Sequence, residues 1–93
     1  MTGPYRTIQV VGWVGEVAIT MRRYSDPPAH FHASSGGRDA LISIEHLSIL
    51  DGELPEGMLA SVRSWAGEHR EALRVNWRKA ARGEPLDRIR EGN

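Results

Sequence analysis

Residues 30–45 read HFHASSGGRDALISIE, and this stretch decides the fold of the chain. Its first part, from His30 to Ser34, alternates in character and predicts a β-strand. Ser35-Gly36-Gly37 predicts a tight turn, because glycine reaches positive φ angles at little cost. The next strand, Arg38 to Glu45, places Ala40, Ile42 and Ile44 on one face. Two strands joined by so short a turn predict an antiparallel hairpin.

Similar β-patterns flank this hairpin on both sides. Residues 7–11 alternate and then meet Gly12 and Gly15, which predict a turn or bulge around Trp13-Val14. In residues 16–22, the apolar side chains fall at every second position, and Ser25 to Pro28 then interrupts the pattern, because proline cannot donate to a ladder. Ser48 to Leu50 predicts a last short segment that ends at an Asp51-Gly52 turn. The sequence therefore predicts an antiparallel meander of about four or five short strands between about residues 7 and 50.

The spacing becomes helical after Leu54-Pro55-Glu56, where a proline and an acidic residue suit a first helical turn. A single helix over residues 56–82 would be about 40 Å long, more than the expected width of so small a domain. We therefore expect one kinked helix or two consecutive helices, with the break near residues 67–70. Gly83-Glu84-Pro85 predicts the end of the last one. The side chains that form the apolar or large stripe are Met58, Leu59, Val62, Trp65, Ala66, His69, Leu73, Asn76, Trp77 and Ala80.

The whole pattern predicts one α+β domain over residues 1–86, with the helices packed on the sheet and residues 87–93 as a C-terminal tail. Leu86 and Ile89 are apolar, so they could fold back onto the domain. Of the 93 residues, 40% are hydrophobic and 26% are charged, which is typical of a globular chain. A chain of this length has a small core, so a partner or a second copy in a homo-oligomer would add stability.

Several functional classes are disfavoured by composition. There is no cysteine, which excludes disulfides and cysteine-based zinc sites. No apolar run approaches a membrane span and the first residues lack a signal-peptide core, so we expect a cytoplasmic protein without a membrane partner. The formal net charge is zero, which argues against non-specific attraction to nucleic acid. Eleven of the twelve basic residues are arginine, which binds carboxylates and phosphates with two hydrogen bonds.

His30 and His32 are the main candidates for chemistry. They are two residues apart on a predicted strand, so both imidazoles should project from one face while Phe31 points to the other. Such a pair can act as general acid and base or can chelate a metal. A metal would need further ligands, and the available ones (His46, His69, Asp26 and Asp39) have no recognisable ligand spacing, so we expect no metal or other cofactor. The alternative is that one histidine is hydrogen-bonded beneath a loop and the other is exposed.

A row of arginines follows on the second half of the helical region, at Arg70, Arg74, Arg78 and Arg82. Their four-residue spacing predicts a row along one side of a helix. The row suits the negative end of the helix dipole, and it also fits a docking surface for an acidic partner or a phosphate backbone. Both interpretations remain open. Trp65 and His69, one turn apart, are more typical of packing than of catalysis.

The order of these features resembles a bacterial family named domain of unknown function 4160. The resemblance covers about residues 8–89 and rests on Ile19-Thr20-Met21, on Pro28 to Ala33, on Gly36-Gly37, on Ala40 to Glu45, on Ile49 to Pro55, on Trp65, on Asn76-Trp77 and on Gly83 to Leu86. In that family the centre usually reads Pro-Pro-His-Phe-His, whereas Ala29 takes the place of the second proline here. The residues that match its motif are His30, Phe31, His32, Trp65, Asn76 and Trp77.

The resemblance implies the toxin-like component of a two-gene toxin–antitoxin module, paired with a small cognate protein of the domain of unknown function 2442 type. Three functions follow as hypotheses. The first is a toxin-like protein that acts on RNA, with His30 and His32 as general acid and base. The second is a non-catalytic module that binds DNA or a partner protein, and the third is a histidine-based metal-binding protein. The candidate binding residues are Arg22, Trp65, His69, Arg70, Arg74, Asn76, Trp77 and Arg78.

Overall fold

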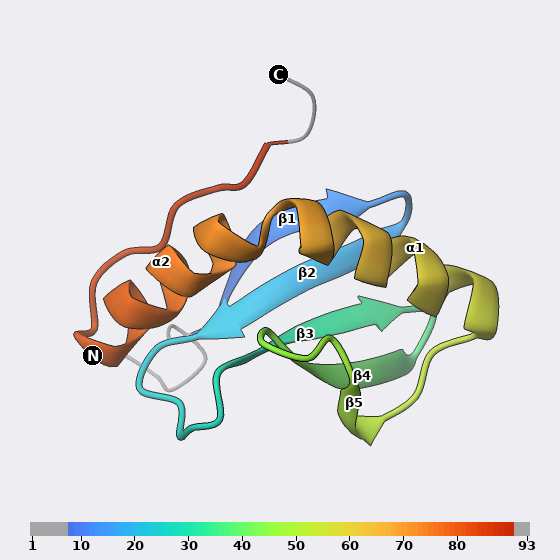
Figure 1. Cartoon of the computed structure of the whole chain (residues 1–93), viewed down its shortest axis with the longest axis horizontal. Coiled ribbons are helices and arrows are strands. Elements are labelled where there is room, and N and C mark those ends of the chain that lie inside the picture. Colours follow the sequence, from blue (N-terminus) through green and yellow to red (C-terminus); the bar gives the residue numbers. More distant parts are fainter. Residues whose placement is uncertain (1–7, 91–93) are drawn as a thin grey trace.

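The computed structural model describes residues 8–90 of the chain, and within them a five-stranded sheet is covered on one face by two helices (Figure 1). The strands are β1 (Ile8–Val14), β2 (Val17–Arg22), β3 (His30–Ser35), β4 (Arg38–Ser43) and β5 (Ile49–Gly52). They pair in sequence order and every pair is antiparallel. The predicted α+β meander is therefore confirmed.

Three details of the strands differ from the prediction. The strand expected from Arg38 to Glu45 ends at Ser43, because residues 44–46 form a turn. The expected bulge is present between Val10 and Gly12, but residues 13–14 continue β1 after it and the chain turns only at Gly15. Asp51 and Gly52 belong to β5, where they pair with β4, and do not form a turn. The predicted start of the first strand at residue 7 lies outside the described residues.

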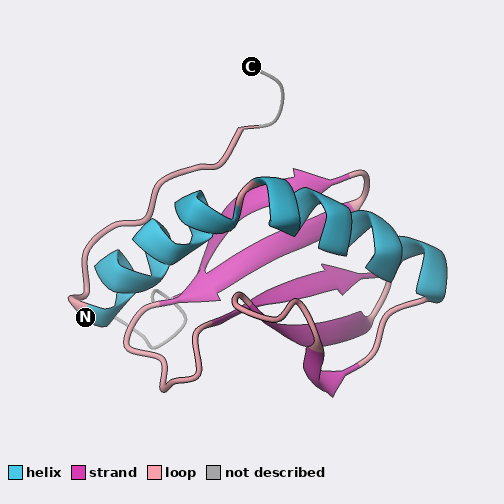
Figure 2. Cartoon of the chain, viewed as in Figure 1, coloured by secondary structure: helices cyan, strands magenta, loops and turns pink. Residues whose placement is uncertain are grey.

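The helical region is divided into α1 (Glu56–Glu68) and α2 (Arg70–Ala81), which follow each other with a bend between them (Figure 2). His69 separates them with non-helical backbone angles, at the place where the length argument required a break. Val62, Trp65 and Ala66 of α1 are buried, as are Leu73, Asn76 and Ala80 of α2. Neither helix has the length and apolar content needed to cross a membrane.

The core lies between the helices and one face of the sheet. Val17, Ile19 and Met21 of β2 are all at most 2% exposed, as the period of two in the sequence requires. Phe31 lies beside them on β3 and is fully buried. The other face of the sheet carries the alternate side chains, and this helix-free side is called the open face below.

The segment after α2 returns to the sheet. Leu86 and Ile89 are 6% and 8% exposed, so both fold back onto the core. The Ile89 N–H donates to the Val11 carbonyl oxygen (2.7 Å) at the bulge of β1. The predicted tail is thus held against the outermost strand as far as it is described, to residue 90.

Candidate functional site

The two histidines lie on the open face of the sheet because β3 alternates. Phe31 points into the core, so His30 and His32 point the other way. His32 is paired with Thr20 of β2 on one side and Leu41 of β4 on the other. Both histidines are half-buried, and their ring centroids are 5.6 Å apart in an edge-to-face arrangement.

His30 has one of its ring nitrogens committed. Its Nδ1 lies 2.8 Å from the Pro28 carbonyl oxygen, and because a carbonyl only accepts, Nδ1 carries a proton in this contact. The proton that His30 can exchange with a ligand is therefore the one on Nε2. The alternative expected from the sequence is that one histidine is hydrogen-bonded to a loop and the other is exposed. The first half of that alternative describes His30.

Trp77 joins the histidines from the helical layer. The pairing of β2 with β3 ends at Thr20 and His32, so His30 lies beyond the last pair of these strands. Trp77 of α2 contacts it there, with the ring centroids 5.1 Å apart. His30, His32 and Trp77, which all carry the family resemblance, are thus brought together.

A hollow of about 410 Å³ adjoins the two histidines. It is lined by Arg22, Arg23, Tyr24, Ser25, Asp26, His30, His32 and Leu41. Of the binding residues predicted from the sequence, Arg22 lies here, whereas Arg23 and Tyr24 had no signal beyond their place after a strand. The Arg23 Nε atom is buried and has no hydrogen-bond partner within residues 8–90.

The electrostatics of the hollow favour a neutral His32. Burial lowers the pKa of His32 from its usual 6.5, and the charges of His30 and Arg22 lower it further, while Asp39 acts in the opposite direction. His32 is therefore an unprotonated imidazole near pH 7, which is the form that accepts a proton.

The metal candidates are dispersed. Within residues 8–90 no three histidine, aspartate or glutamate side chains lie close enough together to hold a metal ion. Asp26 lines the hollow, but Asp39 is hydrogen-bonded to Ser34 and His46 is exposed in the turn after β4.

Trp65 and His69 form a separate pair at the break between the helices, with ring centroids 4.9 Å apart. Trp65 is 3% exposed and packs so closely on β1 that a Cβ at Gly12 would lie 2.9 Å from its ring. Its contacts are those of a core residue that fixes α1 to the sheet, as the packing interpretation expects.

The arginine row of α2 is engaged within the chain. The Arg70 Nε donates to the Ile44 carbonyl oxygen (3.1 Å), and Arg74 binds both carboxylate oxygens of Glu45 (2.8 and 3.0 Å). The hydrogen bond from Arg74 lowers the pKa of Glu45. The remaining contacts of the row are Arg74 and Arg78 with Glu71 (3.5 Å each) and Arg82 with Glu84 (3.0 Å). A ligand at this row would have to compete with these carboxylates, so a binding role for Arg70, Arg74 and Arg78 stays a prediction.

Asn76 is fully buried and acts on the chain itself. Its Nδ2 donates to the Asp87 carbonyl oxygen (2.9 Å), and its Oδ1 accepts from the Asp87 N–H (2.8 Å). Both polar groups of the side chain are thereby used. Asn76 contributes to any site by fixing the segment after α2.

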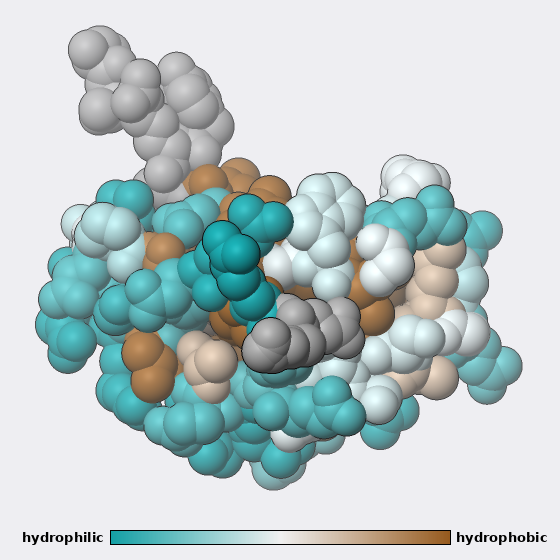
Figure 3. Space-filling model, turned by 90° about the horizontal axis from the view of Figure 1, so that it is seen from above, coloured by the Kyte–Doolittle hydropathy of each residue, from teal (hydrophilic) through white to brown (hydrophobic). Residues whose placement is uncertain are grey.

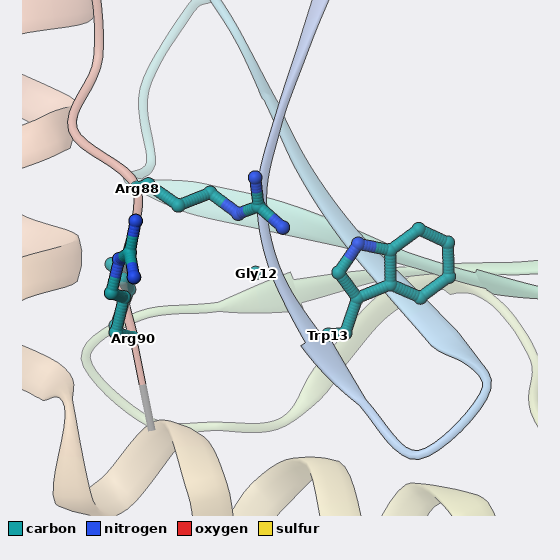
Figure 4. Close-up of a pocket in the computed structure, with 5 residues that line it drawn as sticks. Gly12, Trp13, Arg88 and Arg90 are labelled. Atoms are coloured by element: carbon teal, nitrogen blue, oxygen red, sulfur yellow. The ribbon is translucent and has the colours of Figure 1, made fainter. Parts of the chain in front are cut away.

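A second depression, of about 430 Å³, was not anticipated from the sequence (Figure 4). It lies between β1 and the C-terminal segment and is lined by Gly12, Trp13, Arg88, Ile89 and Arg90. The sequence signal that could have revealed it is the alternation of Arg88-Ile89-Arg90, which places two arginines on one side of an extended segment whose apolar residue is buried.

Comparisons with known proteins give one match. A family model described as Domain of unknown function (DUF4160) matches residues 17–78, from the start of β2 to within α2. The matched range contains His30, His32, Trp65, Asn76 and Trp77. No curated protein and no solved structure matches the chain.

Proposed function

The chain belongs to the DUF4160 family, and from this premise we propose that it is the toxin-like component of a two-gene toxin–antitoxin module and that it cleaves RNA. The observation that carries the proposal is the pair of adjacent imidazoles on the open face, with His32 half-buried and Arg22 and Arg23 lining the same hollow. Ribonucleolytic cleavage without a metal needs one group to accept a proton and another to donate one.

The proposed reaction assigns one step to each histidine. His32, held neutral by burial, accepts the proton of a ribose 2′-hydroxyl as its oxygen attacks the adjacent phosphorus. His30, in its protonated form, donates its Nε2 proton to the 5′-oxygen as the P–O bond breaks. The products are a 2′,3′-cyclic phosphate and a free 5′-hydroxyl, and the proton gained by one ring balances the proton lost by the other.

The arginines of the hollow supply the electrostatic part. The negative charge on the phosphorane grows as the 2′-oxygen attacks, and guanidinium groups placed near it stabilise the transition state. Arg22 is close enough to His32 to act on its charge, and Arg23 lines the same hollow with a buried Nε.

The test compares growth, RNA ends and purified activity. Expression of the chain alone should arrest growth and produce RNA fragments with 2′,3′-cyclic phosphate ends. His32→Gln and His30→Gln should each reduce the cleavage rate by about 10²- to 10⁴-fold. His46→Gln is the matched control, because His46 is an exposed histidine outside the hollow. Normal growth with intact RNA, or full activity in both hollow variants, would reject the proposal.

A second candidate function is supported by a different observation. Ile8, Val10 and Trp13 of β1 are 44%, 38% and 48% exposed and lie on the open face. Neighbouring exposed apolar side chains of this kind favour a protein-binding surface. A non-catalytic module would therefore bind its small cognate protein at this surface. Val10→Asp should then abolish co-purification with the product of the adjacent gene. If this second function is the right one, neither the wild-type protein nor any variant should cleave RNA.

A further inference from the structure

The segment that carries Arg88 and Arg90 is held firmly in place although it contains no regular secondary structure. Ile89 is buried and bonded to β1, which fixes the residue between the two arginines. The further contacts are Gln9 with both backbone groups of Leu86 (2.8 and 3.2 Å), Asn76 with both backbone groups of Asp87, and Lys79 with the Asp87 carboxylate (2.8 Å). The two arginines therefore project from a preorganised backbone, which reduces the entropy that a ligand must overcome.

The guanidinium groups of Arg88 and Arg90 face a common depression. Within residues 8–90 neither has a hydrogen-bond or ion-pair partner, in contrast to the arginines of α2. Figure 4 shows the Arg88 side chain extending from the C-terminal segment across β1 toward the indole of Trp13, with Arg90 beside it on the segment. Two neighbouring guanidinium groups suit a phosphate, which they bind with charge-assisted hydrogen bonds.

Trp13 adds an aromatic surface to this depression. Its side chain is 48% exposed, unlike the packed Trp65. In the view of Figure 3, strongly hydrophilic side chains lie near the middle of the surface, with small separate apolar patches on either side of them. An exposed indole beside cationic groups is the combination with which proteins bind single-stranded nucleic acid, because the base stacks on the ring while the cations contact the backbone.

Trp13, which lines this depression, and the two histidines lie on the same face of the sheet, the open face. Trp13 pairs with Ala18, and Ala18 pairs with Ser34, which is two residues from His32 on the same strand. Trp13 and the histidines are thus separated by two strand spacings across the sheet, about 10 Å, and by a short distance along it. One short strand of RNA can contact both places.

We propose that Trp13, Arg88 and Arg90 form a nucleotide-binding subsite for single-stranded RNA, in which a base stacks on the indole and the neighbouring phosphate binds the two guanidinium groups. The subsite deepens the proposed function, because its role in directing a substrate to His30 and His32 rests on RNA cleavage there. Binding itself does not depend on that chemistry. An acidic protein segment would also be attracted by the arginines, but it would not require the indole face.

The test measures binding without cleavage. A fluorescently labelled 2′-O-methyl oligouridylate has no free 2′-hydroxyl, so its binding can be followed by anisotropy in the full-length protein. Trp13→Ala should weaken binding about 5- to 150-fold, the range for one stacked base. The double variant Arg88→Gln/Arg90→Gln should weaken it too, and should reduce the slope of log affinity against log salt by up to about 1.4. Arg63→Gln, at an exposed arginine of α1, is the matched control and should bind like the wild type.

The outcomes separate this subsite from the proposed catalysis. Binding that survives in His32→Gln but falls in the subsite variants supports the subsite, whether or not the wild type cleaves RNA. Wild-type affinity in both subsite variants would overturn it, as would an equal loss in Arg63→Gln. A different result is that oligoglutamate displaces the RNA at an equal concentration while Trp13→Ala leaves the RNA affinity unchanged. That result would also overturn the subsite and would indicate an acidic protein as the ligand. Thermal unfolding of each variant checks that the fold is intact.

Discussion

Replacement of Asn76 by alanine should destabilise the protein strongly and release the segment that carries Arg88 and Arg90. The side chain is fully buried and makes two hydrogen bonds to the backbone of Asp87, at 2.9 and 2.8 Å. Each such bond contributes about 1 kcal/mol, and the space left by the side chain adds to the loss, so we expect a decrease of about 2–4 kcal/mol in the free energy of unfolding. A domain of this size has about 5–14 kcal/mol in total, so this is a large fraction of its stability.

Two measurements check this expectation. Urea unfolding followed by tryptophan fluorescence gives the change in free energy, with Ser64→Ala on the exposed side of α1 as a control that should differ by less than about 0.5 kcal/mol. Hydrogen exchange shows which part of the chain is loosened, because the Ile89 N–H is protected from exchange only while its hydrogen bond to the Val11 carbonyl oxygen is intact. In Asn76→Ala the Ile89 amide should lose its protection before the amide of Phe31 in the central strand. A loss below about 1 kcal/mol with unchanged protection at Ile89 would refute the assignment of Asn76 as the residue that holds this segment.

Three further predictions follow from the packing and the titration of the chain. Because the pKa of His32 is lowered, the unfolded chain takes up a proton near pH 6.5 before the native state does, so stability should fall as the pH drops below about 6.5. His32→Gln should show a smaller fall in urea unfolding between about pH 7.5 and 5.5, and an equal fall would contradict the lowered pKa. Gly12→Ala should cost about 1–3 kcal/mol, since the new methyl group would press on the Trp65 ring; calorimetry of this variant combined with Trp65→Phe should show that the two losses are not additive. Gly52→Ala should lower the melting temperature more than Gly36→Ala, because both have positive φ but only a Cβ at Gly52 would overlap the backbone of β4, and similar melting temperatures would show that β5 adjusts freely.

Much of the fold was predictable because it is encoded in local periodicity. The alternation along residues 30–45 and the glycine turn within it specify a hairpin, and the change to helical spacing after Pro55 specifies the second layer. The break at His69 was predicted by length alone, since one straight helix would extend beyond the domain. The extent of β1 and β5 was missed, because the pairing of residues 13–14 and 51–52 depends on the neighbouring strand.

The candidate site was only partly predictable. The placement of His30 and His32 on one face follows from the period of two in a strand, which the sequence determines. The engagement of the α2 arginines was not predictable, because the partners of Arg70 and Arg74 lie 26 and 29 residues away along the chain. The four-residue spacing predicts that these arginines lie along one side of a helix. It does not predict which carboxylate or carbonyl group of the sheet lies opposite each of them.

The sequence by itself determined that this protein is an α+β meander with two helices, that it carries a histidine pair on one strand face, and that it resembles the family to which it belongs. Only the tertiary structure decided that Trp77 meets His30, that Asn76 holds Asp87, and that Arg88 and Arg90 lie beside Trp13. Side-chain alternation is a property of a few consecutive residues and can be read from them directly. The contacts that the tertiary structure decided join residues 11 to 77 positions apart, and they arise only when the helices pack on the sheet and the last segment returns to its first strand.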